Sequence, residues 1–214
     1  MRARTKIRAE VILEVDGREV YRGPSSSFVT NFSKLLLGML SAPGNTAIGS
    51  SGAIASTTVT DTDGLSKTVW TEWYASGTYR GGGTPMAMGA PDNDSSFGVV
   101  VGSGTTPVSP SDYNPSSLIP HGTSTGQLDY EPHTVTSSYS STSSYVEISR
   151  SFVNRSGADV IVREVGLISR SYWKDLSAVR QDIKYLIARD VLPNPILIPN
   201  LSSLTVRYRI SLSL

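Results

Sequence analysis

The segment Leu201–Leu214 reads LSSLTVRYRISLSL, and apolar and polar side chains alternate along it with almost no error. One set of alternate positions is apolar: Leu204, Val206, Tyr208, Ile210, Leu212 and Leu214. The other set is polar: Thr205, Arg207, Arg209, Ser211 and Ser213. Because successive side chains of a β-strand point to opposite faces of its sheet, a period of two predicts a strand with one buried face and one wet face.

Similar patterns recur through the rest of the chain. Residues 5–15 alternate, and Asp16-Gly17 separates them from a second strand-like run at 18–21, which predicts a tight hairpin. The further runs with strand character are 57–60, 65–73, 97–101, 135–139, 145–153, 160–168 and 185–191. Helices do not alternate with these runs, so a parallel α/β sheet is not expected. The spacing is typical of a sandwich of roughly eight to ten strands.

Two segments depart from the strand pattern. Ser25, Ser26 and Ser27 offer helix N-caps, and apolar residues then recur at helical spacing until Ser41–Gly44. These apolar residues are Phe28, Phe32, Leu35, Leu36 and Met39. One apolar stripe on a short helix predicts packing on a sheet, with docking into a partner as the alternative. Residues 170–183 are charged and less regular, and they predict a short helical excursion.

We therefore expect an all-β fold, an antiparallel, jelly-roll-like β-sandwich with one short amphipathic helix and long loops. Residues 1–214 would form a single domain, with loop or hairpin insertions at about 43–96 and 103–133. The second insertion lies in a stretch with five prolines. Loops of this length tend to be functional or to fold against a neighbour.

The composition excludes several classes of protein. The chain has 214 residues, a net charge of +1 and no cysteine, so disulfide frameworks and thiolate metal sites are excluded. Proteins that bind nucleic acid through its phosphates are usually more basic, so we do not expect that partner. No apolar run is long enough to span a membrane, and no signal-peptide pattern follows MRARTKIRAE. We expect no membrane insertion, and synthesis in a cytoplasm.

No motif of the chain supports catalysis or a cofactor. Gly102-Ser103-Gly104 is followed by prolines instead of the helix that a dinucleotide loop needs. Asp61-Thr62-Asp63-Gly64 resembles the start of a calcium loop, but Trp70 stands where the bidentate Glu belongs. His121 and His133 are too few for a zinc site. A Ser–His–Asp arrangement stays open because its members can be distant in sequence, although no nucleophile elbow supports it. We expect no enzyme, no metal and no cofactor.

Two groups of residues are candidates for contacts between proteins. Arg2, Arg4, Lys6 and Arg8 would place four positive charges on one strand face, either to protect a sheet edge or to dock on an acidic protein surface. The second group is rich in aromatic residues and lies next to glycine-rich loops: Trp70, Trp73, Tyr74, Tyr79, Met86 and Met88. Such residues form local core, an interface or a platform for sugars.

Two charged residues lie inside apolar runs. Glu164 interrupts Val160–Ile168, and Arg189 interrupts Tyr185–Val191. A buried carboxylate needs a partner, so we hypothesise that Glu164 and Arg189 pair across adjacent strands. The alternative is that each of them faces solvent.

Four segments in this order, followed by the alternating end, resemble structural proteins of tailed viruses of bacteria and archaea. They are SFVTNFSKLLLGML (27–40), FGVVVGSGTTP (97–107), ISRSFVNRSGADVIVREVGL (148–167) and LIARDVL (186–192). The family includes tail-, collar- and capsid-associated components, and residues 41–95 are largely unmatched. The resemblance implies an all-β virion component that forms a symmetric oligomer, and it brings no catalytic residue.

We therefore expect a structural component of a virion whose partners are further copies of itself and other virion proteins. Contacts would be made by the basic strand face, the aromatic stretch and the loop 103–133. The alternative function is a receptor- or glycan-binding module of a viral fibre.

Overall fold

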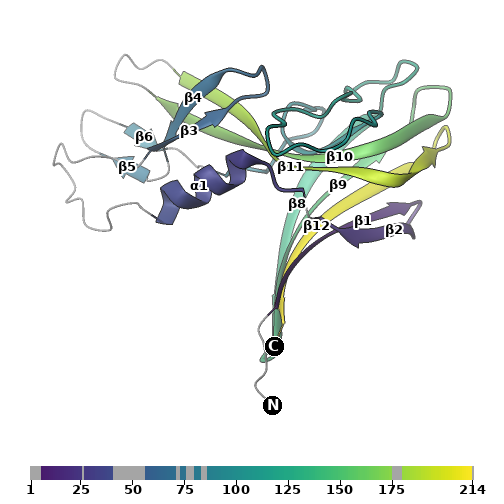
Figure 1. Cartoon of the computed structure of the whole chain (residues 1–214). Helices are drawn as coiled ribbons and strands as arrows, with labels where there is room; N and C mark the ends of the chain where they lie inside the picture. Colours follow the sequence, from purple (N-terminus) through teal and green to yellow (C-terminus); the bar gives the residue numbers. More distant parts are fainter. Residues whose placement is uncertain are drawn as a thin grey trace.

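The computed structural model describes residues 6–25, 27–40, 56–70, 73–75, 80–82, 86–174 and 180–213 (Figure 1). These residues form antiparallel sheets and a single short helix, α1 (Thr30–Leu40), in agreement with the expected β-rich class. No described helix is long and apolar enough to cross a membrane.

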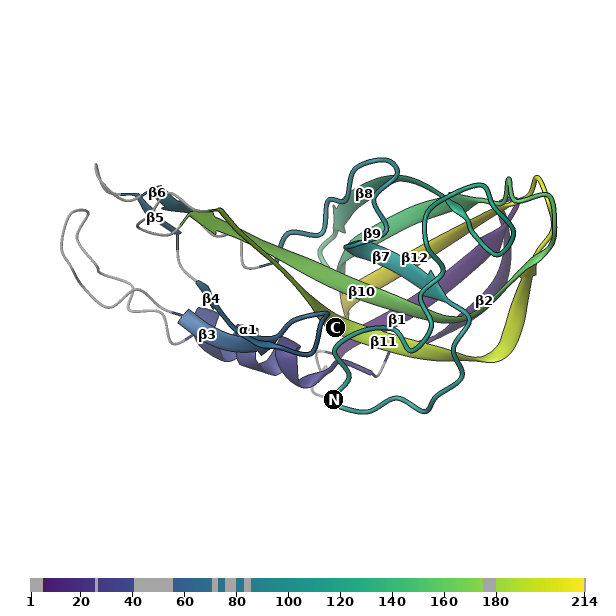
Figure 2. The same ribbon diagram turned by 90° about the horizontal axis from the view of Figure 1, so that it is seen from above.

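Two sheets make up the body. The five-stranded sheet has the order β2 (Arg18–Pro24), β1 (Lys6–Val15), β12 (Ser203–Ser213), β9 (Ser143–Val153) and β8 (Asp129–Tyr139). The three-stranded sheet has the order β11 (Arg180–Ile198), β10 (Val160–Lys174) and β7 (Gly98–Gly102). Figures 1 and 2 show the smaller sheet lying across the larger one. Two small hairpins, β3 (Ser56–Thr60) with β4 (Ser66–Trp70) and β5 (Trp73–Ala75) with β6 (Arg80–Gly82), lie beside the far end of β10 and β11.

Both sheets contribute to one hydrophobic core. The alternating segment forms β12, the central strand of the larger sheet, where Leu204, Val206 and Tyr208 are buried. All five residues of β7 are buried. Burying an apolar side chain such as valine or leucine contributes about 1.5–3 kcal/mol, so the residues buried between the sheets stabilise the fold.

The expected helical excursion at 170–183 is wrong for the described residues, because β10 continues to Lys174 and β11 begins at Arg180. Its charges are explained by contacts between neighbouring strands. Arg170 Nε on β10 donates to Asp182 Oδ1 on β11 over 2.7 Å. Charged pairs of this kind stabilise exposed antiparallel strands without any helix.

Helix α1 begins at Thr30, later than the serines that were expected to cap it. One face of the helix packs on β3 and β11, where Leu35 is fully buried. The side chain of Asn31 is also buried: its Nδ2 donates to the carbonyl oxygens of Thr60 and Leu186, and its Oδ1 accepts from Thr60 N–H. Of the expected apolar stripe, Leu35 is buried and Phe28 and Phe32 pack against the core, but Leu36 and Met39 are exposed. The contacts of Asn31 and Leu35 fix the rotation of the helix about its axis.

The larger sheet extends past the smaller sheet as a projecting arm (Figure 1). We define the arm as residues 6–9 of β1, 135–139 of β8, 143–148 of β9 and 210–213 of β12. Its strands stay in register, with Ile7 opposite Leu212 and Tyr139 opposite Ser144. The arm therefore continues the sheet of the body without a break in pairing between β1, β12 and β9.

Candidate functional site

The apolar inner face of the larger sheet continues onto the arm, where the smaller sheet no longer covers it. Along β12, Leu204, Val206 and Tyr208 are buried, but Leu212 on the same face is 42% exposed. Its neighbours on this face are also exposed, with Ile7 at 73%, Tyr139 at 75% and Val146 at 40%. Since the alternation does not change, the exposure results from the end of the covering layer.

This face contains a groove of about 470 Å³. Its lining comes from β8, β9, β12 and the segment before β7: Met86, Met88, Val135, Tyr139, Ser144, Tyr145, Val146, Ile148, Ile210 and Leu212. None of the described residues that line the groove is charged. An open groove of this composition favours contact with another apolar surface.

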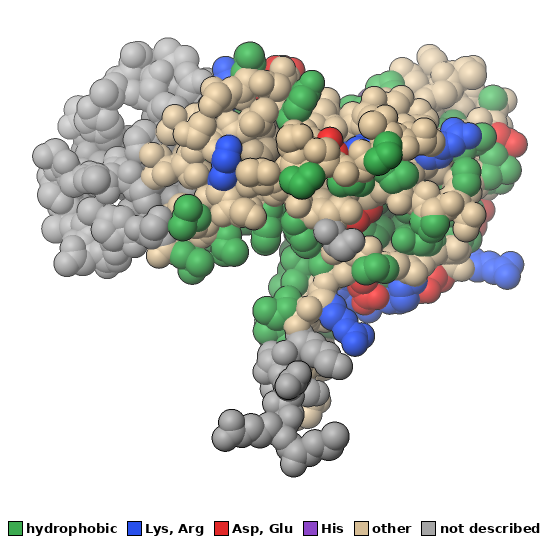
Figure 3. Space-filling model, viewed as in Figure 1, with side chains coloured by type: hydrophobic (Ala, Val, Ile, Leu, Met, Phe, Trp, Pro, Cys, Tyr) green, Lys and Arg blue, Asp and Glu red, His purple; other side chains and the backbone are tan. Residues whose placement is uncertain are grey.

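The outer face of the larger sheet is different, because its charges neutralise one another. Arg209 binds Glu147 over 2.5 Å, and Arg207 binds Glu14 over 2.7 Å. Arg22 bridges Glu10 and Glu19, and its hydrogen bonds lower the pKa of Glu19. In Figure 3 charged side chains line one side of the arm and hydrophobic ones the other. The two faces are therefore chemically distinct, and only the inner one is apolar.

The structure describes part of the expected contact residues. Arg2, Arg4 and Tyr79 lie outside the described residues, as do the side chains of Lys6, Trp70, Trp73 and Tyr74. Arg8 is exposed near the tip of the arm. Met86 is half-buried, and both methionines line the groove.

Met88 requires a correction, because it is only 8% exposed and belongs to the hydrophobic core. The sequence analysis missed Val135, Tyr139 and Val146, which are more exposed apolar residues of the arm. The available signal was the alternation of 145–153, which places Val146 and Ile148 on one face.

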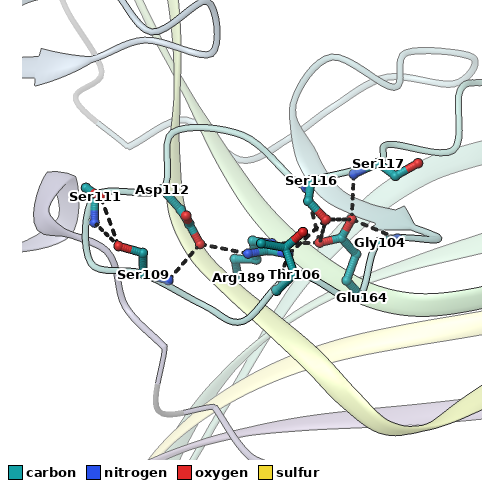
Figure 4. A network of polar contacts seen from close by, with 9 residues as sticks. All are labelled: Gly104, Thr106, Ser109, Ser111, Asp112, Ser116, Ser117, Glu164 and Arg189. Carbon is teal, nitrogen blue, oxygen red and sulfur yellow. Dashed lines mark hydrogen bonds and ion pairs between the residues drawn. The ribbon is translucent and has the colours of Figure 1, made fainter.

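The structure brings Glu164 and Arg189 together. Arg189 Nε donates to Glu164 Oε2 over 2.6 Å, from β11 to β10, and both side chains are fully buried (Figure 4). Burial alone would lower the pKa of Arg189, but its hydrogen bonds to Asp112 and Glu164 raise it above its ordinary value. Arg189 therefore keeps its charge inside the protein.

The same pair holds the long segment between β7 and β8. Glu164 accepts hydrogen bonds from the backbone N–H groups of Gly104, Ser116 and Ser117 (Figure 4). Arg189 donates to Asp112 Oδ2 and to the carbonyl oxygen of Thr106, both over 2.8 Å. Two charges of the smaller sheet thus fix residues 104–117 in place.

This network explains why glycine occurs in Gly102-Ser103-Gly104, and the explanation involves no nucleotide-binding site. A Cβ atom at Gly104 would collide with the side chains of Ser116 and Glu164, so only glycine lets the backbone approach the carboxylate. The Asp61–Gly64 segment is a turn between β3 and β4, as expected. Asp61 Oδ1 accepts from the N–H groups of Asp63 and Leu65. No group of three or more metal-ligating side chains occurs among the described residues.

The two histidines lie in different surroundings. His121 Nδ1 accepts from Tyr130 N–H over 3.3 Å and lies 3.5 Å from Asp129 Oδ1. His133 lies on β8 opposite Arg150 of β9, and its ring nitrogens are buried. Burial lowers the pKa of His133 to about 4, and the charge of Arg150 acts in the same direction. The carbonyl group of Met88 has the opposite, smaller effect and raises this pKa. His133 is therefore neutral in the folded protein at pH 7.

We predict that His133 makes the stability dependent on pH. Between the ordinary pKa of 6.5 and the folded value of about 4, the unfolded chain binds a proton that the folded protein does not. The free energy of unfolding should therefore fall by about 2–3 kcal/mol as the pH is lowered through this window. Denaturant unfolding of the protein and of His133→Gln at pH 4–8 measures the difference. An identical pH profile for both proteins would contradict the prediction.

No family model matches the chain, and no curated protein or solved structure matches it significantly.

Proposed function

We propose that the protein is a non-enzymatic structural component of a virus particle that self-assembles and docks on other virion proteins. The observation that supports self-assembly is the uncovered apolar face of the arm. Single exposed apolar side chains are normal, but a contiguous patch that continues a core face is typical of an interaction surface. The free energy is lowered when another molecule removes this patch from water, including the side chains of Ile7, Tyr139 and Leu212.

The virion context is supported by the resemblance of four ordered segments and the alternating end to tail-, collar- and capsid-associated proteins. In this proposal the chain is made in the host cytoplasm and then incorporated into the tail, the neck or the capsid surface. Contacts with other virion proteins would use the loops at 43–96 and 103–133 and the basic N-terminal strand.

We also propose that the two sheets form a jelly-roll-like β-sandwich. The shared core and the antiparallel pairing throughout both sheets support this assignment. In such a frame the sheets supply rigidity while the segments that connect them vary. The arm would then be an extension of one layer of the sandwich.

The proposal predicts association that depends on the arm. Light scattering over a concentration series should give a mass above that of a monomer, and Val146→Asp should raise the dissociation constant at least about tenfold, because the interface would bury an unpaired carboxylate. Val20→Asp is the matched control, because Val20 on β2 is 44% exposed and lies away from the groove. It should assemble like the unmodified protein.

Two outcomes would overturn self-assembly through the arm. One is a monomer at every concentration; retention of that monomer on a glycan array would then favour the receptor-binding alternative. The other is assembly of Val146→Asp with the same dissociation constant as Val20→Asp.

A further inference from the structure

In the part of the chain that the structure describes, helix α1 has a second apolar face that is exposed. One face is anchored by Asn31 and Leu35, while the opposite face exposes Leu36, Leu37, Met39 and Leu40. Leu40 is 77% exposed, and Lys34 is the one charged residue of the helix. Figure 3 shows hydrophobic side chains on the underside of the lobe that carries α1 in Figure 1.

The dimensions of the arm groove suit a short helix. Its floor spans β8, β9 and β12, and with strands about 4.8 Å apart this gives a width of roughly 10 Å. An α-helix with its side chains is about 10–12 Å across. Val135–Tyr139 extends for roughly 13 Å along the groove, and the eleven residues of α1 extend for about 16 Å.

We propose that α1 of a second copy of this chain lies in the arm groove. A helix that places an apolar face in an apolar groove is a recurring mode of recognition, usually anchored by residues one turn apart, such as Leu36 and Leu40. The described lining of the groove and the exposed leucines of α1 carry no charge, so their contact desolvates no ion of these residues. The inference rests on the proposed self-assembly and names the two surfaces that meet.

The occupant is a second copy because α1 cannot turn toward the groove of its own copy. The hydrogen bonds of Asn31 to Thr60 and Leu186 hold the helix on β3 and β11, with the exposed leucines directed away from that contact. Each copy thus carries one helix and one groove. Because these surfaces differ, repeated contacts of this kind build a ring or a helical polymer.

A mixing experiment tests this arrangement. The helix variant carries Leu37→Asp and Leu40→Asp, and the arm variant carries Val146→Asp; all three side chains are exposed, so the fold should be retained. Each variant alone should have a dissociation constant at least about tenfold higher than that of the unmodified protein. An equimolar mixture should form a 1:1 dimer, because the intact helix of the arm variant meets the intact groove of the helix variant.

Native mass spectrometry measures the masses present in the mixture. In the control mixtures, Val20→Asp replaces the helix variant or the arm variant in turn. A monomeric unmodified protein would reject the proposed self-assembly itself. Two outcomes would reject only the contact between helix and groove, provided that the unmodified protein assembles. One is a helix variant that assembles equally well, and the other is a mixture that stays monomeric. A helix variant with a lower Tm and an unchanged mass would also reject it, because another segment of the same copy would then cover α1.

Discussion

Replacing Glu164 by Gln should lower the free energy of unfolding by about 3–5 kcal/mol, because Arg189 then loses one of its two carboxylate partners in the interior and keeps only Asp112. Both side chains are at most 1% exposed, so water cannot take the place of the lost partner. Glu164 also accepts from the N–H groups of Gly104, Ser116 and Ser117, and these bonds weaken at the same time. Guanidinium unfolding of the purified variant measures the loss.

A double-mutant cycle separates the ion pair from general damage. Glu164→Gln and Arg189→Gln should each be strongly destabilising, and the double variant should lose clearly less than the sum of the two. The exposed pair of Glu19 and Arg22 is the matched control, and its cycle should show a far weaker coupling, because water screens the two charges. Additive losses for Glu164 and Arg189 would show that the two charges act independently and would contradict the role of the pair.

Replacing Arg150 by Met should destabilise the protein by a similar amount, about 3–5 kcal/mol. Arg150 is 1% exposed, and its guanidinium donates to the carbonyl oxygens of Glu131 over 2.7 Å, Pro91 over 2.9 Å and Phe97 over 3.2 Å. It also lies 4.7 Å from the centre of the Tyr130 ring. Methionine fills much of the volume, but it leaves the carbonyl groups without donors.

The stability of Arg150→Lys should lie between those of Arg150→Met and the unmodified protein, because a single ammonium group cannot reproduce the planar fork of donors of a guanidinium group. Arg155→Met serves as the control, since the Arg155 side chain is half exposed, and its loss should stay below about 1 kcal/mol. Urea unfolding midpoints compare the variants. Equal midpoints for Arg150→Met and the unmodified protein would mean that the three carbonyl groups find other donors.

The sequence predicted the strands best where local patterning and tertiary packing agree. The alternation of 204–214 identifies a strand with a buried face, and Leu204 and Val206 are indeed buried. The same pattern could not show that Leu212 is exposed. That depends on where β10 and β11 stop covering the larger sheet, which no local pattern records.

Charged residues were informative when they interrupted an apolar run. Glu164 and Arg189 were paired on that ground, but Asp112 was not, because it reaches Arg189 from a loop 77 residues away in sequence. Arg150 was overlooked although it occurs between Ile148 and Phe152 on one face of a strand. An arginine at an inward position of an alternating segment is itself a signal of a buried polar site.

The prediction of a helical excursion at 170–183 was wrong for a different reason. Its charges broke the apolar pattern and suggested a short helix, whereas Arg170 and Asp182 stabilise an exposed part of a long hairpin. Pairing between strands depends on residues that are distant along the chain, so propensity within a window cannot reveal it.

The position of β12 between β1 and β9 sets the order of events during synthesis. β1 pairs at once with β2, but Lys6 pairs with Ser213, so the second neighbour of β1 is made about 200 residues later. Contacts between such distant residues form late and slowly. Until residues 203–213 emerge, the nascent chain has neither a completed larger sheet nor an arm. Copies would therefore be unable to join through the arm until β12 has been made.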